Sequence, residues 1–149
     1  MKNASSAEEK GYDAGKKVSG IKRHIAVDTE GLPHAIHITT ANVPDKVAGA
    51  AMIKKYKANL KKVKNVLVDG AYTGEPFANS IKQSINATVE IVKRSDLPKF
   101  TTIPKRWVVE RTFSWLEKCH RLWKNCERKL PTSLAMVQLA FVRLLVKRC

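Results

Sequence analysis

Residues 105–128, with the sequence KRWVVERTFSWLEKCHRLWKNCER, constrain the fold more than any other stretch of the chain. At about 100° per residue, their apolar side chains gather over about half of a helical circumference. The pattern therefore predicts one long amphipathic helix that must bury a wide face against the rest of the molecule. That face comprises Val108, Val109, Phe113, Trp115, Leu116, Cys119, Leu122, Trp123 and Cys126.

The opposite edge of this predicted helix carries a narrow row of charged side chains. The row comprises Arg106, Glu110, Glu117, Arg121, Lys124 and Arg128. One interpretation is a solvated face with ordinary ion pairs four residues apart, such as Arg106 with Glu110, and periodicity alone favours it. The other is that the carboxylate of Glu110 holds a metal ion beside a phosphate backbone. The helical pattern by itself leaves both interpretations open.

Net charge indicates the kind of partner. The 149 residues include 28 Lys and Arg against 13 Asp and Glu, which gives a formal net charge of +15. Hydrophobic residues make up 44% of the chain, enough for the core of one domain spanning residues 1–149. The excess of positive charge favours a polyanion, most often nucleic acid. A membrane partner is disfavoured because the basic residues are spread over the whole chain.

The N-terminal residues and the cysteines indicate the compartment. The first twenty residues lack the apolar stretch of a secretory signal. The three cysteines and four histidines show no paired-ligand spacing, which argues against a zinc site. We therefore expect a cytoplasmic protein with reduced thiols.

The rest of the chain predicts an α/β domain with a mixed sheet. Residues 1–19 form a polar N-terminal arm without periodicity, predicted to be a loop. Alternation predicts an antiparallel hairpin of strands 21–28 and 34–39. The further predicted elements are a helix at 42–60, strands at 65–69 and 87–93, a helix at 74–85, and a last helix at 134–148 that is apolar nearly all round and hence buried.

Asp69 ends the apolar run of residues 65–69, NVLVD. Such a run fits a strand buried on both faces, and open α/β sheets place their ligands at the carboxyl ends of strands. Asp-Gly is also a common turn pair, so an aspartate with a purely local role explains the same residues. Both interpretations of Asp69 stay open on this pattern.

Three stretches together resemble one family. They are GYDAGKKVSGIKRHIAVDTEG (11–31), VLVDGAYTG (66–74) and PKRWVVERTFSWLEKCHRL (104–122). They resemble the catalytic domain of bacterial insertion-sequence transposases, and the resemblance extends from about residue 2 to the C-terminus. It implies an RNase H-like fold, a triad of two aspartates and a glutamate that holds two Mg²⁺ or Mn²⁺ ions, and DNA strand cleavage and transfer in the nucleoid. The implied DNA partners are the element ends and the target.

The resemblance also assigns residues. Asp69 matches the second aspartate of the triad and Glu110 its glutamate. Arg106 matches a basic position near the cut phosphate, and a second basic position after the glutamate falls on Lys118 or Arg121. Further candidate DNA contacts are Lys22, Arg23 and Lys105.

The first aspartate of the triad has no counterpart in this chain. The resemblance places it on a central strand just upstream of the position that aligns with Lys2 and Asn3, and residues 1–10 contain no aspartate. We therefore expect the first strand to be missing, the two-ion site to be incomplete, and the chain to be inactive alone. An upstream transposase fragment would supply the missing aspartate in trans, and a homodimer would form through the gap that the missing strand leaves. The alternative is a non-catalytic DNA-binding remnant or interaction protein.

Overall fold

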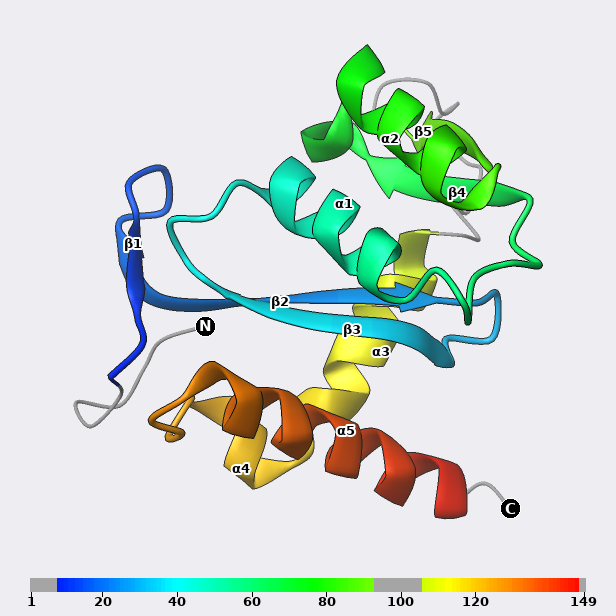
Figure 1. Cartoon of the computed structure of the whole chain (residues 1–149). Coiled ribbons are helices and arrows are strands. Elements are labelled where there is room, and N and C mark those ends of the chain that lie inside the picture. Colours follow the sequence, from blue (N-terminus) through cyan, green and yellow to red (C-terminus); the bar gives the residue numbers. More distant parts are fainter. Residues whose placement is uncertain (1–7, 93–105, 148–149) are drawn as a thin grey trace, which may run out of the picture.

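The computed structural model describes residues 8–92 and 106–147, with only the backbone of Arg106. It confirms the mixed α/β class (Figure 1). The elements, in chain order, are β1 (Gly11–Asp13), β2 (Val18–Val27), β3 (Pro33–Thr40), α1 (Asp45–Lys55), β4 (Asn65–Asp69), the 3-10 turn η1 (Gly70–Tyr72), α2 (Glu75–Ile85), β5 (Thr88–Val92), α3 (Arg106–Glu117), α4 (His120–Trp123) and α5 (Leu130–Val146).

The predicted hairpin is confirmed. Strands β2 and β3 pair antiparallel from Ile21 opposite Thr40 to Ala26 opposite Ala35, with a bulge after Ala26. The turn between them is closed by Asp28, whose Oδ1 accepts hydrogen bonds from the backbone N–H groups of Glu30 and Leu32. Side-chain acceptance of backbone N–H groups is the usual reason for aspartate in turns.

Part of the polar arm is ordered as a second hairpin, so the prediction of a loop over residues 1–19 was wrong there. Strand β1 pairs antiparallel with the start of β2, with Gly11 opposite Gly20. The turn depends on Asp13, whose Oδ1 accepts from the N–H groups of Gly15 and Lys16. This local hydrogen bonding leaves no trace in the hydropathy pattern.

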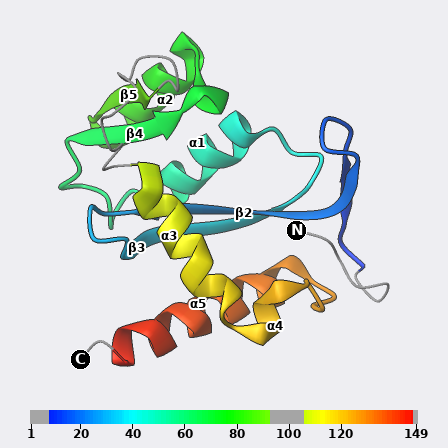
Figure 2. The ribbon, with the colours of Figure 1, turned by 180° about the vertical axis from the view of Figure 1, so that it is seen from behind.

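Strands β4 and β5 pair in parallel and are joined by α2, a β-α-β unit. The predicted strand 65–69 has the observed bounds, and the predicted helix 74–85 begins one residue later with Gly74 as its N-cap. The described strands form two sheets, β1-β2-β3 and β4-β5, and not the single mixed sheet that was predicted. Helix α1 lies between the two sheets in both ribbon views (Figures 1 and 2).

Two apolar clusters lie on opposite faces of the β2–β3 sheet, because alternate residues of a strand face opposite ways. The α5 cluster joins the sheet to helices α3, α4 and α5; its buried members are Ile21, Ile36, Ile38, Leu116, Leu122, Val137, Ala140 and Phe141. The α1 cluster joins it to α1 and α2; its buried members are Ala35, Met52, Ile53, Leu60, Phe77, Ile81, Ile85 and Ala87.

The prediction of a single long helix over residues 105–128 was wrong. Helix α3 ends at Glu117, Cys119 has the extended backbone of an N-cap, and the short α4 is followed by extended backbone at Lys124. The break turns Leu122 into the α5 cluster, whereas Trp123, predicted to be buried, is 80% exposed. The residues after Glu117 therefore do not continue the helix face that carries Glu110.

The buried face of α3 differs from the predicted one. It includes Val108, Thr112 and Leu116, and Val109 is exposed. The helix crosses the sheet obliquely as seen from behind (Figure 2). Thr112 Oγ1 lies 3.1 Å from the carbonyl oxygen of Gly31 in the β2–β3 turn and 2.9 Å from that of Val108, so the helix is held close to the turn.

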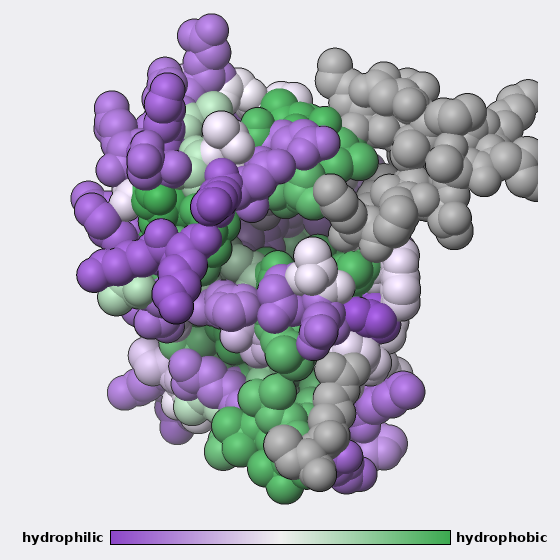
Figure 3. Space-filling model, turned by 90° about the vertical axis from the view of Figure 1, so that its right-hand side faces the viewer, coloured by the Kyte–Doolittle hydropathy of each residue, from purple (hydrophilic) through white to green (hydrophobic). Residues whose placement is uncertain are grey.

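Helix α5 covers the sheet with one face only, which corrects the prediction that it is buried all round. Val137 is fully buried, whereas Leu139, Val142, Leu145 and Val146 are exposed. Hydrophobic surface is visible at the lower end of the molecule, near the C-terminal end of α5 (Figure 3). Among the described residues, no helix has the length and apolar character needed to cross a membrane.

Candidate functional site

Asp69 is the last residue of β4 and its side chain is exposed. Its Oδ1 accepts a hydrogen bond of 3.0 Å from the N–H of Ala71, which makes Asp69 the N-cap of η1. The local role of Asp69 is therefore confirmed, and its role at a ligand site stays a prediction. One oxygen closes the turn, and Oδ2, which makes no hydrogen bond with the described residues, stays available to a ligand at the carboxyl end of a parallel strand.

Tyr72 lies beside Asp69, and the sequence interpretation gave it no role. Its phenol packs against Phe77, with ring centroids 5.4 Å apart, and its ring approaches Gly49 of α1. Burial, followed by the negative charges of Asp45 and Asp69, raises the pKa of Tyr72 to about 12. The phenol is therefore a protonated hydrogen-bond donor next to two carboxylates from different elements.

Glu110 lies on the second turn of α3 and is exposed, as predicted. Its backbone carbonyl accepts from Ser114 Oγ at 3.1 Å. Its neighbour Arg111 is held in place: the guanidinium lies 4.2 Å and 4.9 Å from the ring centroids of Trp107 and Trp115 and donates to the carbonyl of Glu30. The stacking orients Arg111 within α3, and its hydrogen bond to Glu30 ties the helix on which Glu110 sits to the β2–β3 turn.

Two of the candidate phosphate contacts before Glu110 cannot be placed. Lys105 lies outside the described residues, and so does the side chain of Arg106.

Of the two positions left open after the glutamate, Lys118 is exposed in the turn between α3 and α4. Arg121 is also exposed, but its guanidinium pairs with Glu127 Oε1 at 2.8 Å and 2.9 Å. Lys118 makes no ion pair with the part of the chain that the structure describes, and its role as a phosphate contact stays a prediction.

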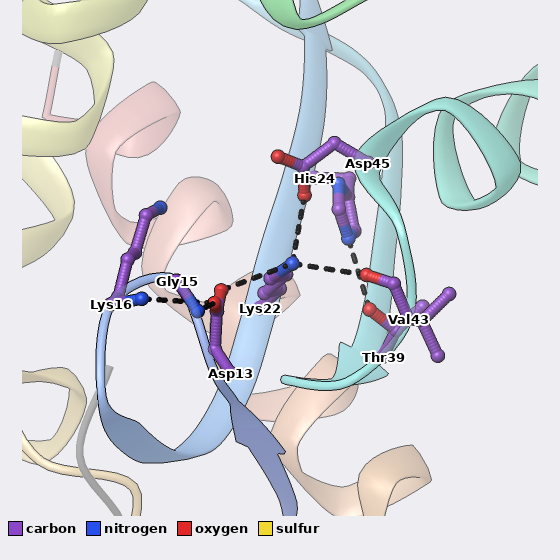
Figure 4. A network of polar contacts seen from close by, with 8 residues as sticks. All are labelled: Asp13, Gly15, Lys16, Lys22, His24, Thr39, Val43 and Asp45. Atoms are coloured by element: carbon purple, nitrogen blue, oxygen red, sulfur yellow. Dashed lines mark hydrogen bonds and ion pairs between the residues drawn. The ribbon is translucent and has the colours of Figure 1, made fainter.

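Lys22 is part of an internal network (Figure 4). Its Nζ lies 3.3 Å from Asp13 Oδ2 and 3.3 Å from Asp45 Oδ1, and it donates to the carbonyl of Val43 at 3.0 Å. Hydrogen bonding from the backbone of Lys16, together with Lys22, lowers the pKa of Asp13. The ammonium thus joins the β1–β2 turn to the start of α1, and the structure does not favour Lys22 as a DNA contact.

Arg23 lies on the sheet face that carries Ile21 and Ile25, because these residues alternate with Lys22 along β2. Its guanidinium is half-buried and donates to the carbonyl of Leu122 at 2.9 Å. Burial lowers the pKa of Arg23 to about 10, against the opposing charge of Glu117. Arg23 thus packs the helix break onto the sheet, and its position does not favour contact with DNA.

The structure places Asp69 and Glu110 on different elements, β4 and α3. Within residues 8–92 and 106–147, no three His, Cys, Asp or Glu side chains come close enough together to hold a metal ion. The chemistry of the donors nevertheless fits a hard divalent cation, because both side chains offer exposed carboxylate oxygens.

A comparison with known protein families matches residues 1–145 to the transposase DDE domain. The chain belongs to the transposase DDE domain family. A protein of Burkholderia cepacia, assigned as the transposase for insertion sequence element IS402, is 29% identical over 131 residues. The match covers 80% of this chain but 60% of that relative, so the chain spans less than two thirds of its length. No solved structure matches the chain.

Membership of the transposase DDE domain family gives the exposed acids a context. Proteins of this family use divalent metal ions, and their substrate is DNA. In this transposase-family chain, Asp69 ends strand β4. Glu110 is exposed on helix α3. Tyr72 lies in the same stretch as Asp69, three residues after it, but its spacing alone indicates no role.

Proposed function

We propose that this chain carries part of the catalytic centre for metal-dependent DNA strand cleavage and transfer in the movement of an insertion sequence. The observation that supports this most is the position of Asp69: an exposed carboxylate at the carboxyl end of a parallel strand, with Oδ2 open, in a transposase-family chain. Glu110 on α3 is the proposed second carboxylate. The DNA substrate would place the protein at the bacterial nucleoid.

The roles of the chain's own residues follow from their chemistry. Asp69 and Glu110 would hold Mg²⁺ or Mn²⁺, which in phosphoryl transfer activates the attacking oxygen and stabilises charge on the leaving one. Lys118 contributes a positive charge for a backbone phosphate, and Arg106 would do the same. Tyr72 stays protonated beside Asp69 and donates a hydrogen bond to an oxygen there.

Two carboxylates hold a divalent ion more weakly than three do, because each contributes charge and one or two oxygens. We therefore propose that the chain alone is inactive and that an upstream transposase fragment completes its two-ion site, since a second copy would carry the same two carboxylates.

The test is nicking of labelled duplex DNA that carries the element ends, with Mg²⁺ or Mn²⁺ and with an extract containing only the upstream fragment of the transposase reading frame as the complementing source. Asp69→Asn and Glu110→Gln should each reduce cleavage at least a hundredfold, because each removes a charged ligand. Glu117→Gln, on the same helix and also exposed, is the matched control and should keep full activity.

Loss of activity in Glu117→Gln equal to that in Glu110→Gln would contradict the assignment of Glu110. Binding of Mn²⁺, followed by electron paramagnetic resonance without DNA, gives an independent measurement. It should weaken in Asp69→Asn and stay unchanged in Glu117→Gln.

A non-catalytic DNA-binding protein is the second candidate, and two observations favour it. The described residues bring no three metal ligands together, and the net charge is +15. This second candidate function predicts DNA binding that is lost at high salt. It also predicts no metal-dependent cleavage, even when the complementing extract is present. Cleavage abolished by Asp69→Asn would exclude it.

A further inference from the structure

A dense run of lysines lies away from the carboxylates. Residues 46–68 contain seven lysines and neither aspartate nor glutamate. Six of these side chains, all exposed, form what we term the lysine cluster: Lys54, Lys55, Lys57, Lys61, Lys62 and Lys64. Within the described residues, no ion pair joins any of these six side chains to a carboxylate, and Lys55 lies over the ring of Tyr56.

Stabilisation of helix α1 explains the presence of only some of the lysines in the cluster. Helix α1 was predicted to continue to residue 60 but ends at Lys55, so only Lys54 and Lys55 lie in its last turn, where positive charge favours the helix dipole. The other four follow in turns held by backbone hydrogen bonds, such as that from Asn59 N–H to the carbonyl of Tyr56. No ion pair joins these four to a carboxylate of the described residues, so they add only mutual repulsion to the folded chain.

The cluster lies at the opposite end of β4 from the candidate site. It follows α1 and leads into Asn65, the first residue of β4, whereas Asp69 is the last. At about 3.3 Å per residue, the strand separates the two ends by roughly 13 Å. Hydrophilic side chains project from this side of the molecule, over the half of the face nearer α1 and α2 (Figure 3). A ligand that touches both ends must be extended.

We propose that the lysine cluster binds the phosphate backbone of duplex DNA, as an anchoring surface separate from Asp69 and Glu110. The identity of the polyanion rests on the proposed function. Lysine ammonium groups act as point charges on phosphates, so this contact is independent of base sequence. The large apolar residues of the same segment face inward: Leu60 is buried, and Tyr56 and Val63 are half-buried. Ala58 is the one exposed apolar residue from 54 to 64, which leaves no large apolar side chain to insert into a membrane.

The test compares two triple variants with the same net charge. Lys57→Gln, Lys61→Gln and Lys62→Gln together remove half of the cluster without altering α1. The control changes three exposed lysines elsewhere, Lys10, Lys124 and Lys147, to Gln. Both lower the net charge from +15 to +12. Far-UV circular dichroism checks that both retain the wild-type fold. Binding of a fluorescein-labelled random-sequence duplex is followed by anisotropy in EDTA over a series of KCl concentrations.

We expect the cluster variant to bind at least about tenfold more weakly at ~0.1 M salt, with a slope of log affinity against log salt shallower by about 2 to 3. The control should lose less than about threefold. Equal losses in the two variants would overturn the proposal, because they would show a bulk-charge effect. Wild-type binding to polyglutamate or to anionic lipid vesicles in preference to DNA would overturn it as well.

The doubly substituted chain Asp69→Asn, Glu110→Gln separates this proposal from the catalytic one. It should bind DNA in EDTA no more weakly than the wild type, because it removes two negative charges and leaves the lysine cluster intact. If the cluster variant loses DNA binding while no nicking is ever found, the catalytic proposal fails and the anchoring surface stands. If nicking requires Asp69 but the cluster variant binds normally, only the anchoring surface fails.

Discussion

Gly31 in the turn between β2 and β3 has a positive φ of 85°, and helix α3 presses directly on it. A Cβ at this position would lie 2.8 Å from Thr112 Oγ1 and 3.2 Å from the Trp115 ring. Both the backbone conformation and the space therefore require glycine here. Thr112 and Trp115 belong to α3, which also carries Glu110, so their contact with Gly31 positions that helix.

Gly31→Ala should lower the free energy of unfolding by about 2 to 4 kcal/mol, since it combines backbone strain with a steric clash against a fully buried threonine. The control is Gly70→Ala, where the added Cβ meets no atom within 4 Å. Urea denaturation followed by circular dichroism measures both. Equal midpoints for the two variants would show that α3 does not pack on the turn as described.

His24 is buried in the β2–β3 sheet, with its Nε2 3.0 Å from Thr39 Oγ1. Burial lowers its pKa to about 4, from an ordinary value of 6.5. In the unfolded chain the imidazole binds a proton below about pH 6.5, and in the folded chain only below about pH 4. Protonation therefore favours the unfolded state, and the stability is lost as the pH falls through this window.

Between pH 7 and pH 4.5, the wild type should lose stability and His24→Gln should lose less. His37, whose pKa is also lowered by burial, contributes in the same direction to both chains. The lowered pKa values of Asp13 and Asp28 act at lower pH, below the ordinary aspartate value of 3.8. Urea midpoints measured across the pH range supply the comparison, and parallel curves for the two chains would contradict a neutral buried His24.

At the scale of elements, short patterns with local causes were predictable. The alternation of β2 and β3, the apolar run of β4 and the glycine before α2 gave bounds close to those observed. The break after Glu117 was not predictable from periodicity, because α4 faces the same sheet as α3 and so keeps apolar residues at compatible spacing. The threonine at the centre of the buried face of α3 also carries no hydropathy signal.

Helix α5 offers a matched pair within one element. Val137 is fully buried against the sheet, whereas Val142 is 54% exposed. Val137→Ala should cost about 2 kcal/mol of unfolding free energy through lost burial and a residual cavity, and Val142→Ala less than about 0.5 kcal/mol. Thermal denaturation of the two variants measures this difference. Comparable losses would restore the sequence-based prediction of a helix buried on every side.

At the scale of the whole molecule, the sequence indicated the two exposed acids but not their environment. Asp69 was predictable as the end of an apolar run. The proximity of the Tyr72 phenol to Asp45 results from the packing of α1 against η1. The spacing of residues in the sequence could not predict it. Conversely, Lys22 and Arg23 appeared as surface cations in the sequence, and tertiary contacts engage both within the fold.

All three tryptophans of the chain, Trp107, Trp115 and Trp123, lie on α3 and α4. Tryptophan fluorescence is therefore a probe of one side of the β2–β3 sheet, where α3, α4 and α5 pack, and it does not sense the β4–α2–β5 unit. Trp123, which is 80% exposed, should emit to the red of Trp115, and the Arg111 charge between Trp107 and Trp115 should perturb both of those indoles. Tryptophan fluorescence should therefore follow the side of the α5 cluster, whereas Tyr56 and Tyr72 report on the half that bears Asp69.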